Sequence, residues 1–165
     1  MTTKHIILRP WEMQALLDGR LKQVRRPVKE QWGNWTFATI LLDGRAVFDE
    51  SNGYAVHHVN IPYAVGDIVA VKETYAIYQT IARDHLNDGE IAYKADGFDT
   101  IRDLINHIKF ISKGECNNVY VNDNRWRSPV TMPQWAVRYR LIVTGVRCER
   151  DESGIWQWVY DVESR

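Results

Sequence analysis

Residues 66–73 read Gly-Asp-Ile-Val-Ala-Val-Lys-Glu. The Gly-Asp pair is typical of a turn. The apolar run that follows it is short, rich in β-branched residues and ends on charged side chains, which is typical of a strand. We therefore expect residues 68–73 to form a central strand of a sheet, with Glu73 at its end.

Both helical and strand-like patterns flank this strand. Residues 11–18 have the spacing of a short helix that stops at Gly19. Residues 98–111 place apolar side chains at helical spacing, and residues 81–86 show a weaker helical pattern. The Asp43-Gly44 pair between two apolar runs predicts a hairpin. The other strand-like segments are residues 5–9, 20–29, 91–94, 119–121, 137–147 and 156–162.

These patterns predict an α+β fold in a single domain, residues 1–165, with a β-rich frame at both ends and a helical insertion at residues 80–115. A chain of 165 residues can bury a core without the help of disulfides or a metal. The expected core includes Ile7, Leu16, Leu17, Ile68, Val69, Val71, Leu141, Val143, Trp156 and Trp158.

The composition excludes several classes of protein. Lys and Arg together number 21, as do Asp and Glu, so the net charge is zero and the chain is not a generally basic, histone-like binder. Its apolar runs are too short to span a membrane and it begins without a signal-like segment, so we expect a cytoplasmic protein with no membrane partner. The two cysteines and five histidines lack disulfide-framework and zinc-site spacing, so we expect no metal and no cofactor.

Two groups of basic residues favour nucleic-acid binding. Residues 20–29 contain five Lys or Arg and no acidic residue, and no acidic residue lies between Arg125 and Arg147. Arginine binds phosphate oxygens with two parallel hydrogen bonds, and interleaved tryptophans stack on bases. The alternative is that each group is only a solvated strand face. The predicted nucleic-acid- or nucleotide-binding residues are Lys22, Arg25, Arg26, Arg125, Trp126, Arg127 and Trp135.

Glu73 is the candidate catalytic residue. A carboxylate at a strand end beside basic residues serves either as a general base or as the partner of an arginine. Because ion-pair networks are common around such groups, we favour the pairing with an arginine.

The segments Gly19-Arg20-Leu21-Lys22-Gln23-Val24-Arg25-Arg26 and residues 66–73 resemble the ASCH domain, a member of the PUA-like superfamily. Segments such as residues 7–11, 93–97, 125–129 and 132–136 are similar to a group of ASCH-like proteins of bacteriophages and prophages. The resemblance implies a PUA-like mixed β-barrel with a cleft that faces RNA or a nucleotide. It also implies single-stranded RNA or a modified nucleotide as the partner, in the cytoplasm of a host cell.

The chain departs from the family signature at two positions. Leu21 stands where the signature has Lys, and Val24 where it has Glu or Thr, while Gly19 and Arg26 match it. Some small ASCH proteins are amidohydrolases that use a Lys, a Thr and a Glu on a modified cytidine. We therefore expect a binding protein rather than an amidohydrolase. Two alternatives stay open: an enzyme, either a ribonuclease or a nucleoside amidohydrolase of the ASCH type, and a phage factor that binds a host or phage protein to inhibit a host defence or to assist assembly.

Overall fold

The computed structural model describes residues 4–29, 33–53, 55–82, 85–86, 89–113 and 116–165. The chain divides into two compact units. The first unit contains Ala15–Ala70 and Tyr139–Arg165 together with the chain's beginning up to Lys4, and the second contains His5–Gln14 and Val71–Arg138.

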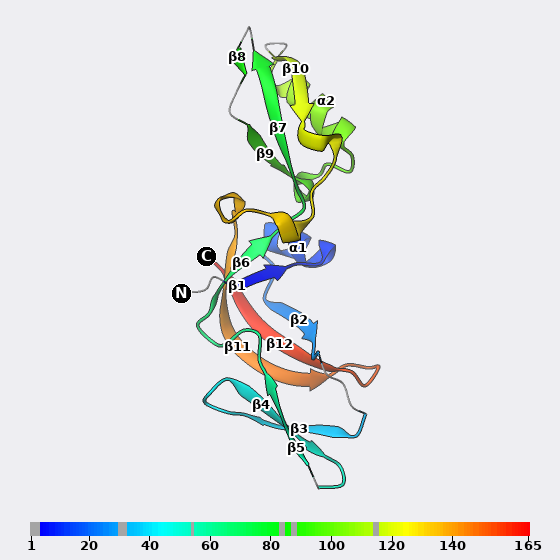
Figure 1. Ribbon diagram of the computed structural model, residues 1–165, viewed down its shortest axis with the longest axis vertical. Helices are drawn as coiled ribbons and strands as arrows, with labels where there is room; N and C mark the ends of the chain where they lie inside the picture. Colours follow the sequence, from blue (N-terminus) through cyan, green and yellow to red (C-terminus); the bar gives the residue numbers. More distant parts are fainter. Residues whose placement is uncertain (1–3, 30–32, 54, 83–84, 87–88, 114–115) are drawn as a thin grey trace. The chain divides into compact units, whose positions relative to one another are not determined.

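The first unit is built on a long hairpin, in which β11 and β12 pair antiparallel (Figure 1). The hairpin contains a bulge between Val143 and Gly145. A Cβ atom on Gly145 would lie 2.6 Å from the Asp161 Oδ2 atom, so a larger residue at this position would displace the Asp161 side chain. The sheet has the order β1 (Lys4–Ile7), β6 (Ile68–Lys72), β11 (Arg140–Arg150), β12 (Trp156–Ser164), β2 (Gln23–Pro27), and only Lys4 of β1 and Ile68–Ala70 of β6 belong to this unit.

The predicted central strand is confirmed, because β6 has a neighbouring strand on each side. The predicted hairpin around Asp43-Gly44 is also confirmed. It joins β3 (Trp35–Ile40) to β4 (Arg45–Glu50), and β5 (Val56–Asn60) completes a three-stranded sheet. Phe48, fully buried on β4, packs edge-on against Trp156 and Trp158, so the two sheets of this unit share one aromatic core.

The second unit is a small sheet covered by a helix. Its strands pair antiparallel around β7 (Tyr75–Ala82), with β8 (His85–Leu86), β9 (Glu90–Tyr93) and β10 (Cys116–Val121). Helix α2 (Ile101–Ile111) begins at a capping box between Thr100 and Asp103. It buries Leu104 and Ile108 against small side chains of the sheet. Helix α1 (Pro10–Leu17) runs from the second unit into the first.

The predicted weak helix at residues 81–86 is wrong. Ile81 and Ala82 belong to β7, where they pair with β10 and β8, and residues 83–84 lie outside the described residues. Pairing with strands distant in sequence outweighs a weak local preference for helix. The segment of residues 80–115 therefore contains strands as well as the predicted helix, together with the short 3-10 helix η1 (Lys94–Asp96).

Most of the predicted core is confirmed. Leu16, Val69, Val71, Leu141, Val143 and Trp158 are buried, and Leu17 and Trp156 are half-buried. The prediction is wrong for Ile7 and Ile68, which are 44% and 42% exposed. Ile7 lies on β1, an edge strand, and Ile68 is the first residue of β6, so neither side chain is covered on all sides.

The fold is thus α+β and consists mainly of sheet, with two α-helices in the described residues. The strands of those residues do not close into a barrel. Three further 3-10 helices lie in the second unit, at η2 (Asn122–Asn124), η3 (Pro129–Thr131) and η4 (Gln134–Ala136). None of the helices described is long and apolar enough to cross a membrane.

Candidate functional site

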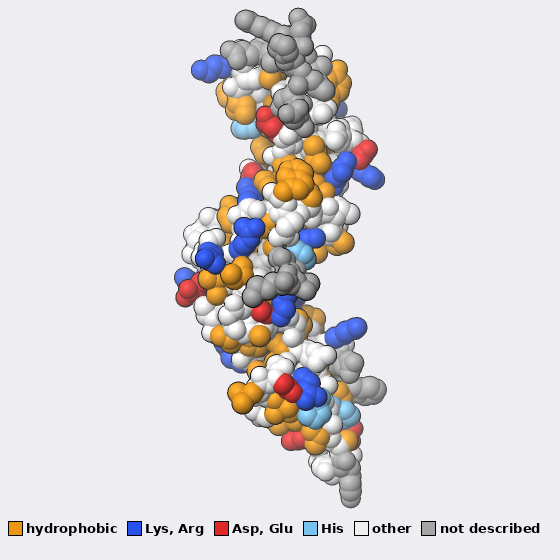
Figure 2. Space-filling model, turned by 60° about the vertical axis from the view of Figure 1, so that its left-hand side comes forward, with side chains coloured by type: hydrophobic (Ala, Val, Ile, Leu, Met, Phe, Trp, Pro, Cys, Tyr) orange, Lys and Arg blue, Asp and Glu red, His pale blue; other side chains and the backbone are white. Residues whose placement is uncertain are grey.

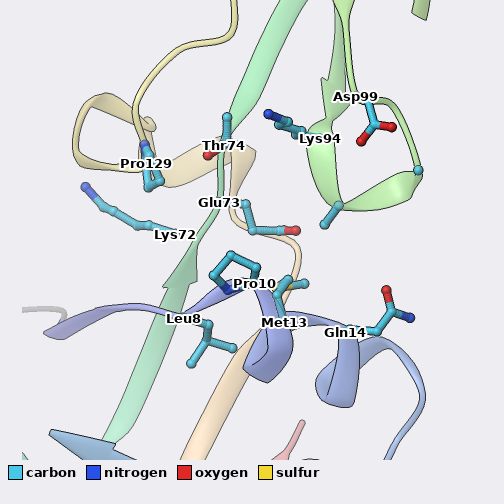
Figure 3. Close-up of a pocket in the computed structure, with 12 residues that line it drawn as sticks. Leu8, Pro10, Met13, Gln14, Lys72, Glu73, Thr74, Lys94, Asp99 and Pro129 are labelled. Carbon is cyan, nitrogen blue, oxygen red and sulfur yellow. The ribbon is translucent and has the colours of Figure 1, made fainter. Parts of the chain in front are cut away.

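The second unit contains a pocket of about 460 Å³ (Figure 3). This volume lies within the range of small-molecule sites, roughly 300–1,000 Å³. The pocket is formed where the start of α1, the end of β6 and the turn around η1 meet. Its lining residues are Leu8, Pro10, Met13, Gln14, Lys72, Glu73, Thr74, Lys94, Ala95, Gly97, Asp99 and Pro129.

Two lysines and a hydroxyl gather at one side of the pocket. Successive side chains of an extended backbone point to opposite faces. Lys72 and Thr74 are accordingly half-buried on one face, whereas Glu73 is buried on the other. The Lys94 N–H donates a hydrogen bond to the Thr74 carbonyl at 3.0 Å. The Lys72 ammonium donates to the Val130 carbonyl at 3.2 Å. We call Lys72, Thr74 and Lys94 the cationic edge of the pocket, and Figure 3 shows the Thr74 side chain between those of the two lysines.

The opposite wall is apolar and comes from the beginning of α1. Leu8 and Met13 are buried, and Pro10 occupies the first helical position, where its missing N–H costs nothing. The fully buried Glu12 carboxylate accepts a hydrogen bond from the Arg9 N–H at 2.8 Å. This contact satisfies a donor at the helix N-terminus and fixes the first turn of α1 beside the pocket.

Glu73 forms a two-armed ion pair with Arg138. The Arg138 Nε and Nη2 groups donate to the two Glu73 carboxylate oxygens, each at 2.9 Å. The Glu73 side chain is 2% exposed and the Arg138 side chain 25%. The structure thus confirms the pairing with an arginine that the sequence favours. Because each carboxylate oxygen already accepts a charged hydrogen bond, Glu73 is poorly placed to accept a proton as a general base.

Arg138 also binds the turn that follows β9. Its Nη1 group donates to Asp96 Oδ2 at 3.1 Å, and its Nη2 group lies 2.7 Å from Asp96 Oδ1. The guanidinium lies 3.9 Å from the centre of the Tyr93 ring, and the Tyr93 hydroxyl donates to the Ala136 carbonyl at 2.6 Å. Burial by itself would lower the pKa of Arg138, but the hydrogen bonds to Glu73 and then Asp96 outweigh it and raise the pKa.

Two exposed polar groups complete the lining. The Asp99 carboxylate and the Gln14 amide lie on the side of Figure 3 away from Lys72. Asp99 follows the turn that ends η1 at Gly97, whose φ of 102° is in the region that favours glycine. A carboxylate and an amide can bind the amino and carbonyl groups at the edge of a base.

The basic residues predicted in the first unit are mostly engaged. Arg25 donates to Glu149 at 3.0 Å and to Gln23 at 3.0 Å. Glu149 also accepts from Arg147 at 2.6 Å, and Asp161 joins Arg147 to Gln23 and so closes a ring of five side chains. The hydrogen bond from Arg147 is the largest influence on Glu149, and together with the charge of Arg25 it lowers the pKa of Glu149. The charge of Arg25 is therefore balanced within the unit.

Lys22 is exposed, and Arg26 is half-buried with Nη1 donating to the Arg25 carbonyl at 2.7 Å. The two signature positions that carry apolar residues, Leu21 and Val24, are buried, at 7% and 0% exposure. They belong to the core of the first unit, where a lysine or a threonine would need a polar partner.

The predicted residues of the second unit have different environments. Arg127 pairs with Asp123 at 3.0 Å, and Arg125 lies 4.0 Å from the same carboxylate with its side chain 74% exposed. Trp126 packs against the hydrophobic cluster beneath α2, whereas Trp135 is 71% exposed. On the face drawn in Figure 2, Lys and Arg side chains are scattered among the others rather than gathered in one stripe.

The prediction from sequence did not include Lys72, Thr74, Lys94 or Asp99 as site residues. Lys72 and Thr74 flank Glu73, so the strand end itself was the available signal. The described residues contain no group of three His, Cys, Asp or Glu that could hold a metal ion. Comparisons with family models, with curated proteins and with solved structures find no match to this chain. Function is therefore inferred from the geometry of the pocket.

Proposed function

We propose that this protein binds a nucleotide, modified or not, either free or as one unit of single-stranded RNA, with that nucleotide in the pocket of the second unit. The observation that carries the proposal is the division of the pocket into a cationic edge and an apolar wall. Ammonium and hydroxyl groups donate to phosphate oxygens, and an apolar wall covers the face of a base. The first feature suits the phosphate of a nucleotide, and the second suits its base.

Each part of the pocket has a distinct role in this proposal. Lys72, Thr74 and Lys94 hold the phosphate, and Leu8 and Met13 cover the base. Asp99 and Gln14 bind the polar edge of the base. Outside the pocket, Trp135 and Arg125 are exposed enough to stack on a second base and to bind a second phosphate if the ligand is a strand.

Binding is favoured over hydrolysis for two reasons. The two oxygens of Glu73 accept hydrogen bonds from Arg138, and the family's Lys and Thr positions are occupied by the buried Leu21 and Val24. An amidohydrolase needs an activated nucleophile or water with a base within reach. Leu21 and Val24 cannot act as a nucleophile or activate water, and the Glu73 carboxylate is engaged by Arg138.

We further propose that the chain is an ASCH-like protein with a PUA-like fold, of the group found in bacteriophages. Gly19 and Arg26 match the signature, and the Gly66-Asp67 turn leads directly into β6. The order of α1 before β2 also agrees with that of the family. The PUA-like assignment is tested by an experimental structure of the complete chain, in which a closed barrel would support it.

Calorimetric titration with the four ribonucleoside 5′-monophosphates tests the binding proposal. Lys72→Ala and Lys94→Ala should each lower the affinity for the tightest-binding monophosphate about tenfold or more, because each removes a charged hydrogen bond to phosphate. Lys109→Ala, an exposed lysine on α2 that does not line the pocket, is the matched control and should bind normally.

Fluorescence anisotropy with labelled single-stranded RNA and DNA at two salt concentrations distinguishes a strand from a free nucleotide. A strand should bind more weakly at higher salt because counterions are released. Absence of binding to nucleotides and strands alike would overturn the proposal. A stoichiometric partner from a host lysate would then favour the protein-interaction alternative. Cleavage of the RNA that is lost in Glu73→Gln would instead indicate a ribonuclease.

A further inference from the structure

We infer that Arg138 is the positioning residue of the pocket: it sets the spacing of the cationic edge, and so makes the site prefer a phosphorylated ligand to the corresponding nucleoside. The inference rests on the proposed function and concerns the same pocket. Arg138 is not one of the residues that line the pocket, so its effect is exerted through its neighbours.

Arg138 joins the two segments that carry the lysines. Glu73, which it binds with two hydrogen bonds, stands between Lys72 and Thr74 in the chain. Asp96, which it binds from the other side, is two residues beyond Lys94 in η1. One guanidinium therefore connects both segments of the phosphate-binding edge, and its dimensions help to set the distance between them.

The connection is held in a single orientation. A guanidinium is planar and presents its donors in a rigid fork, which a lysine cannot reproduce. Its face rests on the Tyr93 ring at 3.9 Å, and the Tyr93 hydroxyl is tied to the carbonyl of Ala136, two residues before Arg138. Contacts at the edge and at the face of the guanidinium thus restrict both its position and its tilt.

The apolar wall is fixed by a different contact. Its residues come from the start of α1, where Glu12 holds the Arg9 N–H. Loosening Arg138 should therefore disturb the phosphate edge more than the base-binding wall. A merely structural role for Arg138 would instead weaken nucleotide and nucleoside alike.

Asp96→Asn separates positioning from simple electrostatics. Removing this carboxylate makes the surroundings of Lys94 more positive, so charge alone predicts tighter binding of a phosphate. If Arg138 positions the edge, the loss of its second charged partner should instead weaken phosphate binding. The Asp96 side chain is 37% exposed, so the substitution is expected to be tolerated by the fold.

The experiment is calorimetric titration of the full chain with the tightest-binding 5′-monophosphate and with its nucleoside. Wild type should prefer the monophosphate by about tenfold or more. Arg138→Lys and Asp96→Asn should each lower the affinity for the monophosphate about tenfold and the affinity for the nucleoside less than about twofold. The matched control is Tyr78→Phe, which removes a hydrogen bond to Glu90 between β7 and β9 at the end of this strand pair away from Tyr93. It should change neither affinity.

Each outcome has one meaning. Equal binding of monophosphate and nucleoside by wild type overturns the inference, as does unchanged or tighter monophosphate binding by Asp96→Asn. If Arg138→Lys does not fold, the monophosphate affinity of Asp96→Asn alone tests the inference. Failure of wild type to bind any nucleotide or strand overturns the proposed function itself, whereas selective wild-type binding with unaffected variants leaves that function standing and removes only the role of Arg138.

Discussion

Replacing Glu73 by alanine should strongly destabilise the second unit, whatever ligand the pocket binds. The substitution removes the more buried of the two carboxylates that bind the Arg138 guanidinium, and it leaves Asp96, the more exposed one. Removing one member of a buried ion pair typically costs about 3–5 kcal/mol, because the other charge stays buried without compensation. Since the Arg138 side chain is 25% exposed and keeps Asp96, we expect the lower end, about 3 kcal/mol.

The assay is urea unfolding followed by tryptophan fluorescence and by circular dichroism. Asp96→Ala is the comparison, and it should cost about 1 kcal/mol or less because the pair it breaks is partly exposed. The double variant Glu73→Met with Arg138→Met should lie close to wild type, because exchanging both members of a buried pair for apolar side chains is often neutral.

Two results would refute this reasoning. A loss below about 1 kcal/mol in Glu73→Ala would mean that the ion pair is not effectively buried. A double variant as unstable as the sum of both single changes would mean that the two side chains do not act as a pair, since coupled residues deviate from additivity.

Two further predictions concern stability. Trp158→Ala, at a side chain 2% exposed in the aromatic core of the first unit, should cost about 3–5 kcal/mol in urea unfolding, and a cost near zero would contradict that burial. Hydrogen bonds from the Thr100 side chain and backbone lower the pKa of Asp103 in the folded protein. The stability that Asp103 gives to helix α2 is therefore present above the pKa of the unfolded chain, and it is lost as pH falls through the lower pKa of the folded protein. Asp103→Asn should reduce this acid sensitivity between neutral pH and about pH 3, as followed by helical ellipticity, and an unchanged pH profile would exclude the capping role.

Local patterns in the sequence were sufficient for most elements of the fold. The turn and apolar run of residues 66–73, the Asp43-Gly44 hairpin and the helix near residues 101–111 all depend on neighbours within a few positions of each other. The prediction of a weak helix at residues 81–86 is wrong because Ile81 and Ala82 belong to β7 and pair with β10, which lies more than thirty positions further along the chain. A strand that is stabilised mainly by pairing carries a weak local signal.

The site was harder to predict for the same reason. Glu73 was identified at a strand end and its pairing with an arginine was favoured, but Arg138 lies 65 positions away in the chain. The cationic edge also combines separate segments, since Lys94 reaches Thr74 through a backbone hydrogen bond. Sequence shows which side chains are available at each strand end, whereas the topology decides which of them meet.

The basic segments show how charge in the sequence differs from charge on the surface. Arg25 and Arg147 lie on different strands of one sheet, and Glu149 and Asp161 on the neighbouring positions of that sheet balance their charges. Such pairing cancels the long-range field of a basic run while leaving its residue count unchanged. In a chain with no net charge, general attraction to a phosphate backbone is accordingly weak. Affinity for a nucleotide must then come mainly from the few contacts of the pocket, so a ligand of this site should be distinguished by its shape and by the position of its phosphate rather than by its total charge.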